Sequence, residues 1–216
     1  MKKLTLALLS ILLTFSANAQ FGGLLKKKSS DSGVSKEQFV DQGNELVTKY
    51  LIIMNGFQGV LDAQGNALGL QKKAAESKAA TDAASKDSNA KNLEKAEQLQ
   101  KELGEEIAKK ASETNEISEE AKKNLQATLP KAALSLAGGT LLIKDSVDWF
   151  KGSVDQFKSA GFLGAAKLKK ELGGAIFVAK GLAKNYPRML KSTKDAFGFA
   201  KKMGCKELDD PTKSFE

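Results

Sequence analysis

Seven basic side chains near the C-terminal end of the chain are its clearest candidates for binding chemistry. Their spacing lets them share the solvent side of successive helices, opposite apolar side chains. A cationic amphipathic helix of this kind can lie on an anionic membrane surface. The alternative is a solvated face that only keeps the protein soluble. The candidate residues are Lys180, Lys184, Arg188, Lys191, Lys194, Lys201 and Lys202.

Residues suited to catalysis are sparse. The 216-residue sequence contains no histidine and one cysteine, Cys205, so it lacks an imidazole base, a Ser-His-Asp triad and the usual transition-metal ligand sets. Ser88 and Lys91 have the spacing of a Ser-Lys nucleophile pair, but they fall in a predicted polar turn without a pocket. We therefore expect no enzymatic activity, metal or cofactor, and interpret Cys205 as buried, with intermolecular pairing as the alternative.

Positive charge is distributed unevenly along the chain. Residues 71–127 contain 11 lysines against 12 acidic residues, whereas residues 151–206 contain 13 basic residues against three acidic ones. Because Arg188 is the only arginine, bidentate phosphate or base contacts are scarce and nucleic acid is not expected as a partner. The expected partners are an anionic envelope lipid or an acidic protein.

The first residues have the order of a secretory signal peptide. Lys2 and Lys3 precede an uncharged apolar stretch from Leu4 to Phe15, and small residues stand at Ala17 and Ala19. We expect residues 1–19 to be removed and the protein to be exported, with the periplasm as destination and secretion as the alternative. After cleavage no segment is apolar enough to span a membrane. Residues 20–34, rich in loop formers, are expected to be a flexible arm.

Apolar periodicity predicts an all-α protein, a helical bundle, from residue 35 onward. Ser35 and Gln38 are spaced as a capping box ahead of an apolar stripe, so residues 35–128 are expected to form N-terminal helices and a charged helical hairpin. Gly56, Gly59, Gly65 and Gly69 predict a kink or break in the continuation of this stripe.

The hairpin is predicted within residues 71–127, where Ala, Glu, Lys and Gln dominate, with its turn at residues 86–89 and a further break near Thr114. One face carries Leu93, Ala96, Leu99, Leu103, Ile107 and Ala111. Acid–lysine pairs such as Glu97 with Lys101 are expected on the exposed side. This seam is either an intramolecular bundle arm or a coiled coil for a partner.

Residues 129–205 are predicted to form basic amphipathic helices. Pro130 is expected in a first helical turn, and Gly138, Gly161 and Pro187 are expected to separate the helices. Residues 206–216 are expected to be a loose tail. The first apolar stripe of this region consists of Ile143, Val147, Phe150, Val154 and Phe157.

The order of these segments suggests a family likeness. A cleavable signal, a Phe21-Gly22-Gly23-Leu24 segment, an Ala/Lys/Glu-rich helical middle and a Gly- and Lys-rich helical end follow one another. This layout resembles a loose group of uncharacterised exported all-helical proteins of Gram-negative bacteria. The resemblance is architectural and implies neither an activity nor site residues.

The sequence thus predicts a non-enzymatic, exported, envelope-associated binding protein that contacts anionic lipid or lipopolysaccharide through its basic C-terminal helices. Two alternatives belong to other classes. One is a structural helical homo-oligomer that uses the seam at residues 93–111. The other is a carrier of an apolar ligand, whose cavity would be lined by Phe150, Phe157, Ile176, Phe177 or Phe197.

Overall fold

The protein is a helical bundle, as predicted. The structure, a computed structural model, describes residues 35–206 and 208–215, and over these residues it consists of α-helices and one 3-10 helix, without a strand. The expected signal peptide at residues 1–19 and the arm at residues 20–34 lie outside the described residues. The elements are α1 (Lys36–Ala67), α2 (Gln71–Lys86), α3 (Ala90–Glu113), α4 (Glu119–Leu134), α5 (Gly139–Ser159), α6 (Gly161–Glu171), α7 (Gly173–Lys202) and η1 (Pro211–Ser214).

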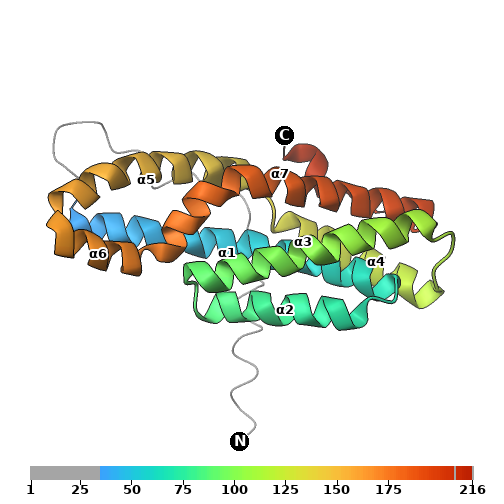
Figure 1. Ribbon diagram of the computed structural model, residues 1–216. Helices are drawn as coiled ribbons and strands as arrows, with labels where there is room; N and C mark the ends of the chain where they lie inside the picture. Colours follow the sequence, from blue (N-terminus) through green and yellow to red (C-terminus); the bar gives the residue numbers. More distant parts are fainter. Residues whose placement is uncertain (1–34, 207, 216) are drawn as a thin grey trace, which may run out of the picture. The chain divides into compact units, whose positions relative to one another are not determined.

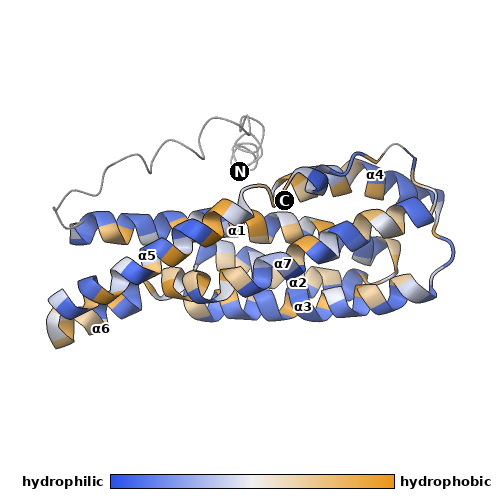
Figure 2. Ribbon diagram, turned by 90° about the horizontal axis from the view of Figure 1, so that it is seen from above, coloured by the Kyte–Doolittle hydropathy of each residue, from blue (hydrophilic) through white to orange (hydrophobic). Residues whose placement is uncertain are grey.

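Helix α1 is the centre of the bundle. It contacts α2, α3, α4, α5 and α7, so its apolar side chains are covered from several sides (Figure 1). Tyr50, Met54, Phe57 and Val60 are almost completely buried along it. Hydrophobic and hydrophilic residues alternate along the helices, as expected where each turns one side to a shared core (Figure 2).

The start of α1 is as predicted, and of the four glycines expected to kink or break the helix only Gly69 coincides with its end. The capping box forms, with the Ser35 Oγ accepting a hydrogen bond from the Gln38 backbone N–H. The helix, 32 residues long, continues through Gly56, Gly59 and Gly65 and ends before Gly69, whose φ is 75°. At Gly56 the missing side chain leaves room for α4: a Cβ there would lie 2.3 Å from the Cβ of Ser135. The glycine permits this close packing.

The helical hairpin is formed by α2 and α3, which turn at residues 87–89. The Asn89 side chain caps α3 by accepting a hydrogen bond of 2.9 Å from the Asn92 backbone N–H. The predicted seam faces the interior of the same chain, where Leu93, Ala96, Leu103 and Ile107 are buried. The hairpin is therefore a bundle arm, and an oligomer would need a different surface.

Two prolines expected near helix boundaries lie inside helices. Helix α4 begins after Ser118, whose Oγ accepts from the Ala121 backbone N–H at 3.1 Å, and it continues through Pro130. Helix α7 likewise continues through Pro187. A proline removes one intrahelical hydrogen bond. Burial of Leu129 of α4 and of Tyr186 of α7, each directly before a proline, helps hold both helices through the defect.

The C-terminal residues are attached to the bundle, although the sequence suggested a loose tail. Helix η1 contacts α4 and α7. Thr212 is fully buried, and Leu208 and Phe215 pack against the core. Predicted breaks at Gly138, with φ of 85°, and at Gly161, with φ of 65°, are both present.

Candidate functional site

Helix α7 carries all seven basic residues identified from the sequence, but it does not gather them on one side. Lys180, Lys184, Lys191 and Lys202 are exposed, and their spacings of 4, 7 and 11 residues put them on one side of the helix. Lys194 and Lys201 fall on the flank of that side. The four exposed lysines are named the α7 lysine row below.

Members of the α7 lysine row already have neighbours within the chain. The Lys191 Nζ lies 2.6 Å from the Asp195 Oδ2, and the Lys202 Nζ donates to the Thr114 carbonyl at 3.2 Å. The Lys180 Nζ lies 5.8 Å from the centre of the Phe150 ring. Pairs at the surface contribute little, so these contacts leave the ammonium groups accessible to an external anion.

Arg188 belongs to a different arrangement. It is half-buried, its Nε is buried without a hydrogen-bond partner, and its charge acts on Tyr50 of α1 and Glu97 of α3. Glu97 accepts hydrogen bonds from the Tyr50 hydroxyl and the Asn185 side-chain amide. Burial raises the pKa of Glu97, against the opposing effects of these hydrogen bonds and of Arg188. This cluster joins three helices and was not found from the sequence, which placed Glu97 on the exposed side.

Helix α5 faces the core with a side that the sequence did not predict. Its buried residues include Leu142, Ser146, Trp149 and Ser153. The Trp149 ring stacks on Phe39 of α1 with centroids 4.8 Å apart, and its Nε1 donates to the Phe39 carbonyl at 3.1 Å. The Ser146 and Ser153 hydroxyls donate to carbonyls of α5 itself, so these small side chains are buried with their hydrogen bonds satisfied.

As a result, the predicted apolar stripe of α5 lies at the edge of the core and is only partly exposed. Val147 is 37% exposed and Val154 is 47% exposed, whereas Ile143, Phe150 and Phe157 are half-buried and pack against the core. The exposure of the two valines is a correction to the sequence interpretation. This partly exposed stripe is named the α5 apolar stripe below.

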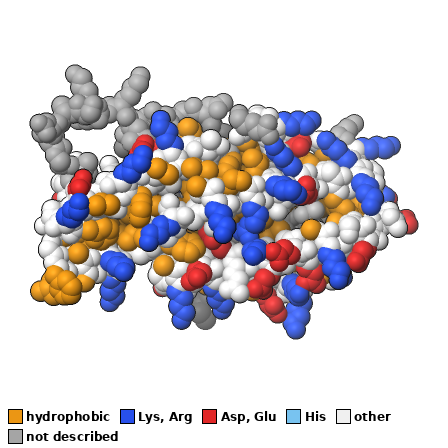
Figure 3. Space-filling model, turned by 45° about the horizontal axis from the view of Figure 1, so that its top comes forward, with side chains coloured by type: hydrophobic (Ala, Val, Ile, Leu, Met, Phe, Trp, Pro, Cys, Tyr) orange, Lys and Arg blue, Asp and Glu red, His pale blue; other side chains and the backbone are white. Residues whose placement is uncertain are grey.

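Lysines stand along one edge of the α5 apolar stripe and over one of its rings. Lys144, Lys151 and Lys158 are exposed and recur every seven residues, which puts them along one edge of the stripe. Lys180 of α7 stands over Phe150 within the stripe. In the space-filling view, hydrophobic side chains gather over this face with lysines spread among them (Figure 3). The combination is that of an amphipathic surface with apolar groups beside cations.

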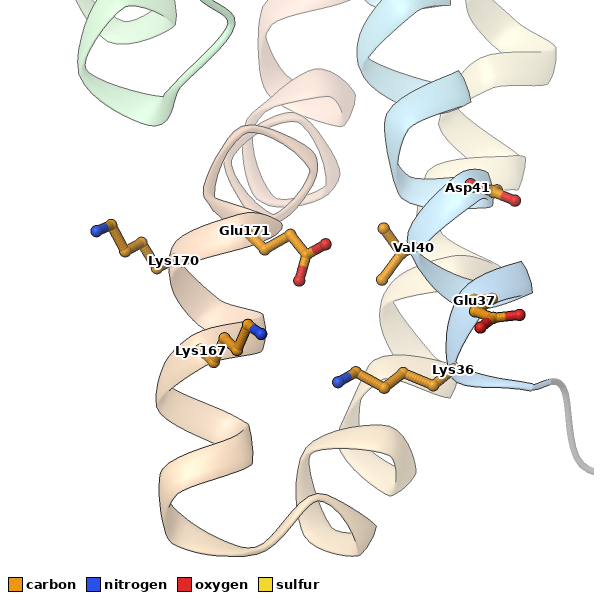
Figure 4. A pocket seen from close by; sticks show the side chains of 7 residues that line it. All are labelled: Lys36, Glu37, Val40, Asp41, Lys167, Lys170 and Glu171. Atoms are coloured by element: carbon orange, nitrogen blue, oxygen red, sulfur yellow. The ribbon is translucent and has the colours of Figure 1, made fainter.

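A cleft of about 650 Å³ lies between the beginning of α1 and helix α6. Lys36, Lys167 and Glu171 point into it, whereas Lys170 points away (Figure 4). Its lining includes none of the phenylalanines expected for a carrier of apolar ligands, and Phe197 is packed in the core. The cleft is open and charged, which does not suit an apolar guest.

Residues considered for catalysis or redox chemistry are held in structural positions. Ser88 lies in the α2–α3 turn, where its carbonyl oxygen approaches Gly174, and Lys91 is exposed. Cys205 is buried, its thiol lies 3.7 Å from the Lys122 carbonyl, and burial raises the thiol pKa. Among the described residues, no group of three or more His, Cys, Asp or Glu could hold a metal ion, and no helix is long and apolar enough to cross a membrane.

Comparisons with protein-family models, with curated proteins and with solved structures found no match to this chain. The functional argument therefore depends on the geometry of the α5–α7 face.

Proposed function

We propose that this protein is an exported, non-enzymatic protein that binds peripherally to an anionic lipid surface through the face formed by α5 and α7. The α5 apolar stripe lies against the surface, and the lysines beside it contact phosphate groups. Phospholipid headgroups and lipopolysaccharide both present such phosphates.

The exposure of the α5 apolar stripe is the observation that supports this proposal most strongly. Helices of soluble proteins turn such a stripe into the core, whereas α5 is held by Trp149 with Val147 and Val154 outside. Exposed apolar groups that recur along one helix mark an interaction site more often than single ones do.

The lysines explain why an anionic surface is the proposed partner. Lys144, Lys151 and Lys158 stand along one edge, where the Lys151 Nζ lies 3.7 Å from the Asp148 Oδ1, and Lys180 of α7 adds charge over Phe150. Each basic group near an anionic bilayer contributes about 1 kcal/mol of attraction at physiological salt. Apolar contact and electrostatic attraction then act together, as they do for interfacial amphipathic helices.

Sedimentation with lipid vesicles tests the proposal. We expect the protein to sediment with vesicles that contain phosphatidylglycerol or lipopolysaccharide, and much less with vesicles of phosphatidylcholine alone. Separate phosphatidylglycerol and lipopolysaccharide samples distinguish the two sources of phosphate. Equal and salt-insensitive absence of binding to all three would exclude the proposed function.

A pair of triple variants assigns the binding to α5. Lys144→Gln/Lys151→Gln/Lys158→Gln should bind anionic vesicles at least about tenfold more weakly, because three attractive charges are lost. Lys91→Gln/Lys95→Gln/Lys109→Gln removes the same charge from exposed positions of α3 and should bind as the wild type does. Equal weakening in both would show that net charge, and not the α5 border, controls binding.

Export is tested separately. Residues 2–19 carry the order of a signal peptide, so N-terminal sequencing of protein from a periplasmic extract should begin at Gln20. Protein that retains Met1 and fractionates with the cytoplasm would contradict this part of the proposal.

A further inference from the structure

The corner between α5 and α6 holds the two most exposed large apolar side chains of the described residues. Phe162 is 90% exposed and Leu163 is 82% exposed. They follow Gly161, whose φ of 65° produces the sharp turn between the helices and is strained for other residues. In water these adjacent Phe and Leu side chains gain almost none of the free energy of burial, which an apolar layer would supply.

Charge changes sharply along the short helix that follows. The first six residues of α6, Gly161–Ala166, carry no charge, and the last five contain Lys167, Lys169, Lys170 and Glu171. With a rise of about 1.5 Å per residue, these lysines stand roughly 8–12 Å behind Phe162 along the axis. The apolar start of α6 is thus separated from its charged end.

We propose that the α5–α6 corner inserts into the apolar layer of the lipid surface, with Phe162 and Leu163 as the inserting side chains. The inference rests on the proposed function and specifies where the protein enters the bilayer. The α5 apolar stripe leads to the same corner, because Val154 and Phe157 lie in its last two turns. Insertion is shallow, since α6 is 11 residues long and charged at its far end.

Serine substitutions at the corner test the inference. Phe162→Ser/Leu163→Ser should weaken binding to mixed phosphatidylethanolamine and phosphatidylglycerol vesicles by at least about tenfold, because most of the inserted apolar area is lost. The matched control, Ile52→Ser/Leu134→Ser, removes two exposed apolar side chains from α1 and α4 and should bind as the wild type does. Circular dichroism checks that each variant keeps its helices.

A fluorescent label reports insertion directly. In a Cys205→Ser background, an environment-sensitive dye at Phe162→Cys should shift to shorter wavelength on vesicles and be quenched by lipids brominated in the acyl chain. The same dye at Ile52→Cys should show neither effect.

The outcomes separate this inference from the proposed function. Wild-type protein that binds no vesicle overturns both. The corner insertion alone is overturned if the wild type binds vesicles, the corner variant binds them equally well, and the emission wavelength of the dye at Phe162→Cys does not shift. In the absence of lipid, the corner variant and the wild type should have the same oligomeric state in solution. A lower oligomeric mass for the variant would show that the corner binds a second copy, which also overturns insertion.

Discussion

Trp149 is the residue that decides the orientation of α5. Its ring lies against Phe39 and its indole N–H reaches the Phe39 carbonyl, so the side of α5 that carries Ser146 and Ser153 must face α1. The sequence predicts an apolar core stripe one position away, because valine and phenylalanine outweigh serine in any periodicity argument. The ring stacking and buried hydrogen bond of Trp149 have a larger effect on the orientation of α5 than the hydrophobicity of the stripe does.

Glu97 is the second residue whose role depends on its neighbours. Its carboxylate lies between Tyr50 and Asn185, and burial raises its pKa from the ordinary value of 4.5. A raised folded-state pKa means that the folded protein binds a proton more tightly than the unfolded chain. The contribution of Glu97 to stability is therefore greatest at low pH and falls as pH rises through the folded-state pKa.

Glu97→Gln should remove this pH dependence. The quantity to follow is the free energy of unfolding of the wild type minus that of the variant. We expect this difference to decrease as pH rises from about 4.5 and to level off above the folded-state pKa of Glu97. Urea denaturation at a series of pH values measures the difference. Glu113→Gln, at an exposed position of the same helix, controls for the lost charge. A difference that is constant with pH would contradict the assigned burial.

At the scale of elements, the bundle depends on a close approach between two helices. In the sequence, the position of this contact is visible only as a glycine. Gly56 of α1 lies against α4, where a Cβ would come within 2.3 Å of Ser135 and 2.9 Å of the Ala132 carbonyl. Glycine in a helix usually predicts weakness, since it costs about 1 kcal/mol relative to alanine. Here the packing of α1 against α4 reverses that expectation.

Gly56→Ala should therefore destabilise the protein by about 1–3 kcal/mol, because overlap with backbone of α4 exceeds the gain in helix propensity. Gly152→Ala is the matched control, since nothing lies within 4 Å of a Cβ there. The control should be neutral or stabilising by up to about 1 kcal/mol. Thermal and urea denaturation measure both. Equal effects of the two substitutions would show that the α1–α4 contact is looser than described.

The hairpin seam yields a prediction that separates a bundle arm from an oligomer interface. Leu103 is 2% exposed within the chain, so Leu103→Ala should lower the free energy of unfolding by about 2–5 kcal/mol. Sedimentation equilibrium should give the same mass as for the wild type. A fall in mass with little loss of stability would instead support the structural oligomer.

For the whole molecule, the uneven charge determines how binding should respond to salt. The hairpin is nearly neutral, whereas residues 151–206 are strongly basic. The Debye length falls from about 30 Å at 0.01 M salt to about 8 Å at 0.15 M, so attraction by exposed lysines weakens over this range.

Vesicle binding of the wild type should therefore decrease as salt rises, but it should not vanish, because apolar contact at the α5–α6 corner is not screened. Phe162→Ser/Leu163→Ser should lose nearly all binding at high salt and keep part of it at low salt. Vesicle sedimentation across salt concentrations measures both curves. Parallel curves for the two proteins would mean that the corner contributes no salt-independent attraction.

The sequence by itself determined the helical class, the capping box at Ser35, the hairpin turn at residues 87–89 and the glycine breaks at Gly138 and Gly161. These features depend on local backbone preference, side-chain caps and periodicity, which are read along the chain. Tertiary structure decided which side of α5 faces outward, why helices continue through Gly56, Pro130 and Pro187, and where Glu97 and Arg188 lie. Those outcomes depend on contacts between helices far apart in the sequence, whose packing energy exceeds the local preferences that predict otherwise.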